Sequence, residues 1–222
     1  MSAQQSCGVA ESCTGVGAPR RALDIAVSLI VLAAMLPVLL VIAIAIRLTS
    51  RGPIIFHQER VGEGGSTFTL HKFRTMIAGS IGPEFTVPHD SRITRVGRVL
   101  RAGHLDELPQ FANVLRGEMT LVGPRPETPG LAARYPPELR QVLAYRPGMT
   151  GPCQVFMGRP SPPPGVDAEE FYLAELVPRR VALDMQFLQR STLRATAALL
   201  VVTLAVVAGL RKAKPARLAD LA

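Results

Sequence analysis

Aromatic side chains are scarce in this chain of 222 residues, where they make up 5% of the sequence and tryptophan is absent. Proteins that bind single-stranded nucleic acid usually stack the bases on aromatic side chains, so this scarcity argues against nucleic acid as a partner. Acidic residues are also few, with 17 Asp and Glu against 25 Lys and Arg and a net charge of +8. A basic excess without aromatics points to an anionic membrane surface or a phosphorylated substrate.

Cysteine is nearly absent as well, with only Cys7, Cys13 and Cys153. An odd number without metal-ligand spacing argues against a disulfide framework and a zinc site, and it favours a reducing compartment. The length fits one domain with an appendage, for which we expect an α+β, mostly helical fold.

Four segments are expected along the chain. They are a disordered tail at 1–19, a membrane segment at 20–50, a catalytic domain at 51–192 and an apolar, then basic, C-terminal segment at 193–222. Within the last of these, the apolar stretch Ala195 to Leu210 is too short to span a bilayer. We expect it to lie in the membrane interface or to pack on the body.

The membrane segment holds an apolar run of 22 residues, Ile25 to Ile46, which is long enough to span a bilayer and too long for a cleaved signal peptide. Pro37 lies near its middle, where a proline kinks a helix. Neither half alone crosses about 30 Å of hydrocarbon. Arginines flank both ends, at Arg20 and Arg21 and again at Arg47 and Arg51. The residues alone leave two topologies open, a spanning helix and a re-entrant helical hairpin bent at Pro37.

Local patterns predict several elements of the catalytic domain. A β-hairpin is expected around the glycine-rich turn at 62–65, which lacks the Lys-Ser/Thr of a phosphate loop. Arginine recurs at every third position of a helix expected to begin near Ser91, as either a solvated face or a cationic wall. The arginines of that helix stand at positions 92, 95, 98 and 101. The strands of the hairpin are expected at 54–61 and 66–72, and further helices at 131–145 and at 169–189, the second of which contains a proline at position 178.

The most informative stretch contains the adjacent carboxylates Asp106 and Glu107, with Pro109 close behind. Because proline is tolerated only near the start of an unbroken helix, we expect a helix from about Glu107 to Leu115, with Asp106 as its N-cap and Gly117 as its stop. The N-terminus of a helix stabilises an ionised carboxylate and attracts phosphate. Ordinary helix capping would account for the same residues.

Several linked motifs resemble those of the bacterial sugar transferases, which are monotopic phosphoglycosyl transferases. The resemblance covers residues 21–189 and rests on KFRTM at 72–76, DSRITRVGR at 90–98, LDELPQ at 105–110, LVGPRP at 121–126 and PGMTG at 147–151. Leu36, His104 and Cys153 stand where the family usually has other residues.

The resemblance implies transfer of a sugar 1-phosphate from a UDP-sugar to undecaprenyl phosphate, with release of UMP, as the first step of exopolysaccharide, capsule, O-antigen or glycoprotein glycan assembly. Asp106 would be the nucleophile that forms a phosphosugar–aspartate intermediate, and Glu107 would hold Mg²⁺. Phosphate would be bound by Arg101, Arg125, Lys72 and Arg74. The resemblance also favours the re-entrant hairpin bent at Pro37.

The implied location is the bacterial inner membrane, with the catalytic body facing the cytoplasm and touching anionic lipid. Nucleic acid is not an expected partner, and a homodimer is left open. A non-catalytic membrane scaffold and a single-pass enzyme are the alternatives that remain.

Overall fold

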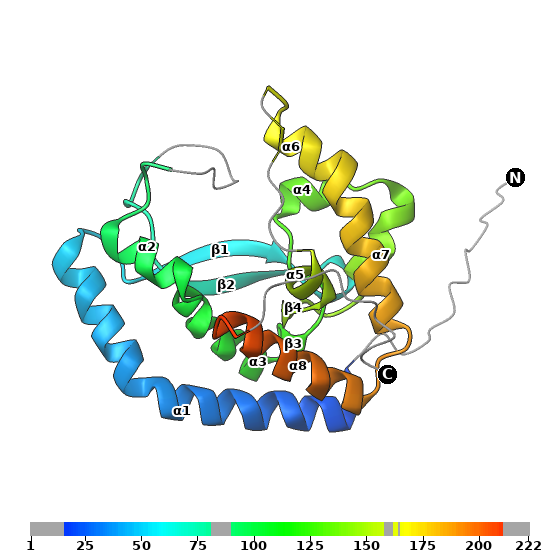
Figure 1. The fold of residues 1–222 in the computed structure, drawn as a ribbon, viewed down its shortest axis with the longest axis horizontal. Coiled ribbons are helices and arrows are strands. Elements are labelled where there is room, and N and C mark those ends of the chain that lie inside the picture. Colours follow the sequence, from blue (N-terminus) through cyan, green and yellow to red (C-terminus); the bar gives the residue numbers. More distant parts are fainter. Residues whose placement is uncertain (1–15, 81–89, 158–161, 164, 211–222) are drawn as a thin grey trace, which may run out of the picture.

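The computed structural model describes residues 16–80, 90–157, 162–163 and 165–210. Helices dominate, and the strands form one antiparallel and one parallel pair, so the α+β, mostly helical expectation is confirmed. A long helix, α1 (Ala18–Thr49), runs along one side of a body built from the other elements (Figure 1). Residues 1–15 of the tail expected at 1–19 lie outside the described residues. The last two residues of that segment belong to α1.

The expected β-hairpin is confirmed as β1 (Ile55–Val61) and β2 (Thr67–Phe73), joined by a short turn η1 (Glu63–Gly65). The strands are antiparallel, with Phe56 opposite Lys72. Side chains alternate between the two faces of a strand, so Phe56, Arg60 and Lys72 share a face. Two of the turn glycines, Gly64 and Gly65, have positive φ, which explains the glycine-rich connection.

The second strand pair is parallel and joins β3 (Thr120–Val122) to β4 (Gly148–Thr150). A Cβ atom at Gly148 would lie 2.0 Å from the backbone nitrogen of Gly123, so the two segments are in direct backbone contact. This backbone contact joins the loop that carries Arg125 to the turn at 147–151.

Helix α1 is continuous through Pro37 and bends along its length (Figure 1). The re-entrant hairpin with two separate helical arms is therefore not shown in the described residues, because Pro37 removes only one backbone hydrogen bond and the helix continues past it. The helix is long and apolar enough to cross a membrane, and the protein buries only 11% of its most apolar window. Together these properties indicate membrane association.

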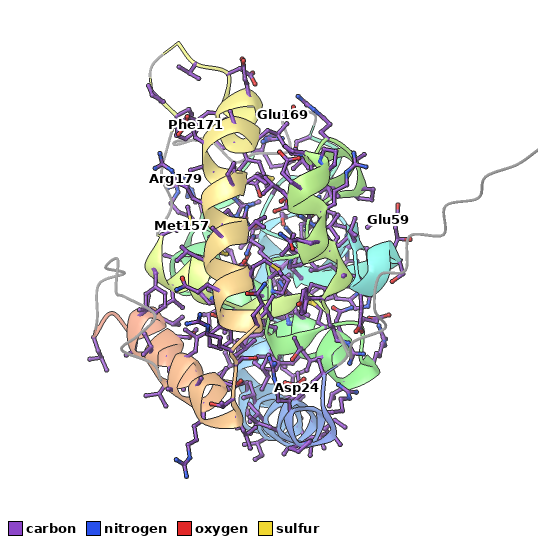
Figure 2. All side chains as sticks on the ribbon, turned by 90° about the vertical axis from the view of Figure 1, so that its right-hand side faces the viewer. Asp24, Glu59, Met157, Glu169, Phe171 and Arg179 are labelled. Atoms are coloured by element: carbon purple, nitrogen blue, oxygen red, sulfur yellow. The ribbon has the colours of Figure 1, made fainter. Side chains whose placement is uncertain are left out.

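Both ends of α1 are attached to the body. Near its start, Asp24 accepts hydrogen bonds from Thr120 Oγ1 at 2.7 Å and from the Leu121 backbone nitrogen at 3.1 Å, and Figure 2 shows Asp24 on the side of the helix that faces the body. Near its end, Ile42 and Ile46 are buried in a cluster with residues of β2 and α2. The intervening helix exposes large apolar side chains at 29, 30, 36, 38, 40, 41 and 44.

Helix α2 (Arg95–Ala102) begins later than expected, because Thr94 caps it by accepting a hydrogen bond from the backbone nitrogen of Gly97. Arg92 is therefore not on the arginine face of the helix. It instead forms an ion pair of 2.6 Å with Asp90, and its hydrogen bonds lower the pKa of that carboxyl to about 2. Arg95 and Arg98 are exposed on the helix, as the solvated-face interpretation expects, and Arg101 lies in its last turn.

The helix expected at 131–145 is instead two short elements, α4 (Pro129–Ala133) and η3 (Pro137–Ala144), because two consecutive prolines interrupt the chain. The helix expected at 169–189 is confirmed as α6 (Ala168–Phe171), a π-helical turn η4 (Tyr172–Leu176) and α7 (Val177–Leu188). The π-turn directly precedes the first turn of α7, where Pro178 has no backbone N–H to donate.

The last described helix, α8 (Leu193–Val207), lies at the same end of the molecule as α1 in both views (Figures 1 and 2). Its Ala195 and Leu199 belong to the main core, together with residues of β2, α3 and β3 and of α5 (Pro152–Phe156). Of the two expectations for this segment, packing on the body is therefore confirmed for one face of α8. Val201 and Leu204 remain exposed on the other face.

Candidate active site

The carboxylate pair lies in the first turn of a 3-10 helix, η2 (Leu105–Gln110), which runs directly into α3 (Phe111–Arg116). The expectation that Asp106 is the N-cap is wrong, because the helix begins earlier, after His104 in a left-handed conformation with φ of 55°. Pro109 is the fifth residue of this helix, so its missing N–H removes at most one early backbone bond. The predicted stop at Gly117 is confirmed, with φ of 84°.

Asp106 is buried, with 9% of its surface exposed. Burial raises the pKa of its carboxyl, and the neighbouring charge of Glu107 raises it further. Lys72 and Arg101 lower the same pKa, which places both cations in the immediate field of the carboxylate. These opposing effects describe a desolvated carboxylate held beside positive charge, an environment suited to a nucleophile or an anion-binding group.

Lys72 reaches this site from β2, and its ammonium lies 5.3 Å from the centre of the Phe56 ring. Its pKa is lowered to about 8, chiefly by burial and then by the charges of Arg60 and Arg125. Asp106 acts in the opposite direction on the same ammonium. Lys72, Arg60, Arg101 and Arg125 thus place four cations around two carboxylates, an excess of positive charge that favours an anionic ligand.

Arg101 and Arg125 are held in different ways. Arg101 donates from Nε to Thr75 Oγ1 at 2.8 Å, which orients its guanidinium at the end of α2. Arg125 lies in the loop after β3, with 47% of its side chain exposed and Nη1 3.9 Å from Glu107 Oε1. That separation is longer than a hydrogen bond, so the contact with Glu107 leaves the guanidinium donors available to a ligand.

Arg60 was missed among the candidate residues. It donates to the backbone oxygen of Pro126 at 3.0 Å, directly beside Arg125. The alternation of side chains along β1 could have found it, because it shares a strand face with Phe56, the cross-strand partner of Lys72.

Arg74 does not join this group. It is buried, and its guanidinium donates to the backbone oxygens of Ser50 at 2.9 Å and Arg51 at 2.7 Å and to the Ser50 hydroxyl. These contacts hold the C-terminal end of α1 to β2. The structure therefore gives Arg74 a structural role in place of the phosphate contact that the motif predicts.

The residues present suit Mg²⁺ in one particular way. Within the described residues, no group of three His, Cys, Asp or Glu side chains could hold a metal ion by itself. Asp106 and Glu107 nevertheless offer hard carboxylate oxygens at one place. Mg²⁺ is commonly held by one or two carboxylates together with substrate phosphates, and the site fits that arrangement.

A family model described as bacterial sugar transferase matches residues 17–209. The chain belongs to the bacterial sugar transferase family. The matched residues include α1, the dyad Asp106–Glu107 and α8, so the family extends over all the elements described above.

Several curated relatives of this sugar transferase carry functional names. It is 41% identical over 77% of its length to a UDP-glucose:undecaprenyl-phosphate glucose-1-phosphate transferase of Caulobacter vibrioides, covering 62% of that protein. It is 41% identical over 63% of its length to a UDP-N-acetylgalactosamine-undecaprenyl-phosphate N-acetylgalactosaminephosphotransferase of Aeromonas hydrophila, covering 34%. It is 37% identical over 77% of its length to an undecaprenyl-phosphate glucose phosphotransferase of Komagataeibacter xylinus, covering 32%. The chain thus spans from about a third to under two thirds of these relatives.

Proposed function

We propose that this protein transfers a sugar 1-phosphate from a nucleoside diphosphate sugar, a UDP-sugar, to undecaprenyl phosphate and so begins the assembly of a bacterial polysaccharide. The observation that carries the proposal is the convergence of four cations on a carboxylate dyad whose first member, Asp106, is buried. Both substrates are phosphate anions, and the relatives are named for this type of transfer. The relatives differ in the sugar that they are named for, so the proposal specifies a UDP-sugar without choosing one.

In the first step, a carboxylate oxygen of Asp106 attacks the β-phosphorus of the UDP-sugar. The bond between that phosphorus and the bridging oxygen breaks, and UMP leaves with the oxygen and its electron pair. Lys72, Arg101 and Arg125 neutralise the charge on the diphosphate and hold it for attack. In the second step, a phosphate oxygen of the lipid attacks the same phosphorus and returns the electron pair to the Asp106 carboxylate.

The chemistry of a bound Mg²⁺ would be to neutralise the leaving phosphate. Glu107 is the side chain we expect to contact it, with Asp106 beside it. Glu107 is partly exposed, with 25% of its side chain accessible, and its ion pair with Arg125 is long. Its oxygens are therefore available to a metal without a strong contact having to be broken.

We further propose that α1 enters the inner membrane as a re-entrant helix and leaves the catalytic body on the cytoplasmic side. The attachment of both helix ends to one body supports this topology, because a spanning helix would carry one end to the opposite side. Arginines near both ends support it as well. A body on the cytoplasmic side would meet the soluble UDP-sugar and contact anionic lipid.

The covalent mechanism is tested by UMP release from the purified enzyme with a panel of UDP-sugars, before any lipid acceptor is added. We expect stoichiometric UMP from the native chain and none from Asp106→Asn, which keeps the size of the side chain but removes the nucleophile. Glu59→Gln is the matched control, because Glu59 is exposed and projects away from the body (Figure 2). If UMP appears only when polyprenyl phosphate is present, the covalent intermediate is refuted.

The topology is tested by cysteines placed at Gly17 and Arg51, one at each end of α1, in a chain whose Cys7 and Cys13 are replaced by Ser. Cys153 is buried and can stay. A membrane-impermeant maleimide added to intact cells should label neither position, and permeabilised cells should label both. Labelling of one position from outside would establish a spanning helix.

A further inference from the structure

We infer that a buried ion pair between Glu127 and Arg180 positions Arg125 for the diphosphate of the donor. The inference rests on the proposed function insofar as it names the ligand. The chemistry required of that ligand is only a nucleoside diphosphate, so its binding can be measured whether or not transfer is observed. Arg180 and Glu127 would be positioning residues.

The backbone around Arg125 is held at three carbonyls, one before Arg125 and two after it. Pro124 accepts from the Gly148 backbone nitrogen at 2.8 Å, and Pro126 accepts from Arg60 at 3.0 Å. Glu127 accepts from the Val61 backbone nitrogen at 2.8 Å. The loop is therefore joined to β4 on one side of Arg125 and to β1 on the other, and two prolines restrict its remaining freedom.

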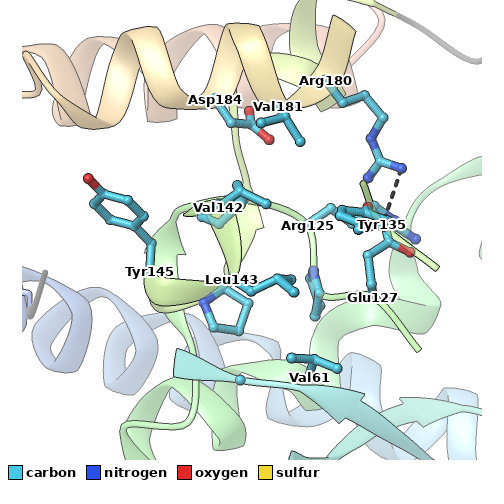
Figure 3. A pocket seen from close by; sticks show the side chains of 14 residues that line it. Val61, Arg125, Glu127, Tyr135, Val142, Leu143, Tyr145, Arg180, Val181 and Asp184 are labelled. Atoms are coloured by element: carbon cyan, nitrogen blue, oxygen red, sulfur yellow. Dashed lines mark ion pairs between the residues drawn. The ribbon is translucent and has the colours of Figure 1, made fainter. Parts of the chain in front are cut away.

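The side chain of Glu127 adds a fourth attachment, to the opposite side of the body. Its Oε1 lies 3.1 Å from Arg180 Nη1 of α7, and 7% and 14% of the two side chains are exposed. Tyr172 of the π-turn donates its hydroxyl to the same Oε1. Burial and then the charge of Glu127 raise the pKa of the Tyr135 hydroxyl, which places Tyr135 near this carboxylate. The dashed line in Figure 3 marks the ion pair, with Tyr135 close beside it.

The ion pair affects the position of Arg125 because the loop is not closely packed on the side that faces Tyr135 and Arg180. A cavity of about 20 Å³ is lined by Arg125, Glu127, Tyr135 and Arg180, among others (Figure 3). A space of that size holds about one water molecule, so it is too small for substrate. Polar contacts, and not complete packing, therefore hold this side of the loop. A shift of the loop into the cavity would move Arg125 relative to Glu107.

The test separates position from stability by removing both charges together. A buried ion pair replaced by neutral groups of similar size often leaves stability unchanged, whereas removal of one partner leaves an unpaired buried charge. We therefore expect Glu127→Gln with Arg180→Met to unfold close to the native temperature, while Arg180→Met alone unfolds at a lower temperature. The matched control is Glu175→Gln with Arg179→Met, an exposed pair 3.0 Å apart on the neighbouring turn, whose Arg179 projects outward (Figure 2).

The first readout is the affinity for UDP, measured by calorimetry on the full chain in detergent. We expect the buried double variant to bind UDP about tenfold more weakly, as loss of one positioned charge-assisted contact predicts, and the exposed double variant to bind like the native chain. The second readout is the rate of UMP release, which we expect to fall by about a hundredfold, the cost of misplacing a group by about 1 Å.

A double-mutant cycle then tests whether the effect passes through Arg125. If Arg180 and Glu127 act by placing Arg125, adding Arg125→Gln to the buried double variant should weaken UDP binding no further than Arg125→Gln alone. Losses that multiply, or native UDP affinity in the buried double variant, would overturn the inference. Failure of the native chain to release UMP from any UDP-sugar would instead refute the proposed function, while the UDP affinities would still decide this inference.

Discussion

Lys72 makes the binding of the donor sensitive to alkaline pH. Its pKa lies near 8, because the ammonium is buried and faces Arg60 and Arg125. An exposed lysine keeps its charge to beyond pH 10. In the free enzyme, Lys72 is about nine-tenths charged at pH 7 and about one-tenth charged at pH 9. The contact that it makes with phosphate is then lost within the range in which enzymes are assayed.

The expected result is a fall in kcat/KM for UMP release of about tenfold per pH unit above pH 8, because this parameter reports the pKa values of the free enzyme. The titration of Lys72 does not itself destabilise the fold in this range. The lowered pKa means that the unfolded chain binds more protons than the folded chain between about pH 8 and 10.5, so this group makes the fold more stable as pH rises.

Lys72→Arg is the decisive control, because arginine stays charged throughout this range. In this variant the substrates and the other residues still titrate as in the native chain. We expect the fall in kcat/KM above pH 8 to disappear. Lys72→Met should lower kcat/KM at pH 7 and also flatten the profile. An unchanged alkaline fall in Lys72→Arg would refute the assignment of that limb to Lys72.

Three further predictions concern stability, each measured by thermal unfolding in detergent. Gly97→Ala should destabilise the fold by about 1–3 kcal/mol, because its Cβ would meet the backbone oxygen of Thr75 at 2.1 Å, whereas Gly130→Ala has open space and should be neutral or stabilising. Arg74→Gln should cost about 3 kcal/mol through its lost bonds to the end of α1, with UDP affinity unchanged; weakened UDP binding would return Arg74 to the site. Asp24→Ala should cost about 2–4 kcal/mol, because it leaves buried donors of β3 unsatisfied, and native stability would contradict this account of how α1 is held.

Features decided by neighbouring residues could be predicted from the sequence. The β-hairpin follows from two alternating segments around a glycine-rich turn, and the stop at Gly117 follows from its freedom to adopt positive φ. The identity of the dyad came from the motif, and the structure surrounds it with the expected Lys72, Arg101 and Arg125. These residues lie within or beside short motifs whose order along the chain already indicates one site.

Features decided by distant partners could not be predicted. Arg74 lies in the same motif as Lys72, yet its guanidinium is drawn to the end of α1, whose location no local pattern indicates. The start of α2 is set by two contacts: Thr94 caps the helix, and Asp90 pairs with Arg92 before the helix begins. The partnership of Glu127 with Arg180 joins elements separated by more than 50 residues, and neither residue stands in a pattern that points to the other.

The attachment of α1 has a consequence for the order in which the protein is made. Arg20, Arg21 and Asp24 belong to the first described helix, but the groups that they bind lie 93 to 171 residues further along the chain. A ribosome completes the helix long before it completes β3 and α3. The residues of α1 are therefore made first, and their polar contacts with the body can form only after β3 and α3 have been made.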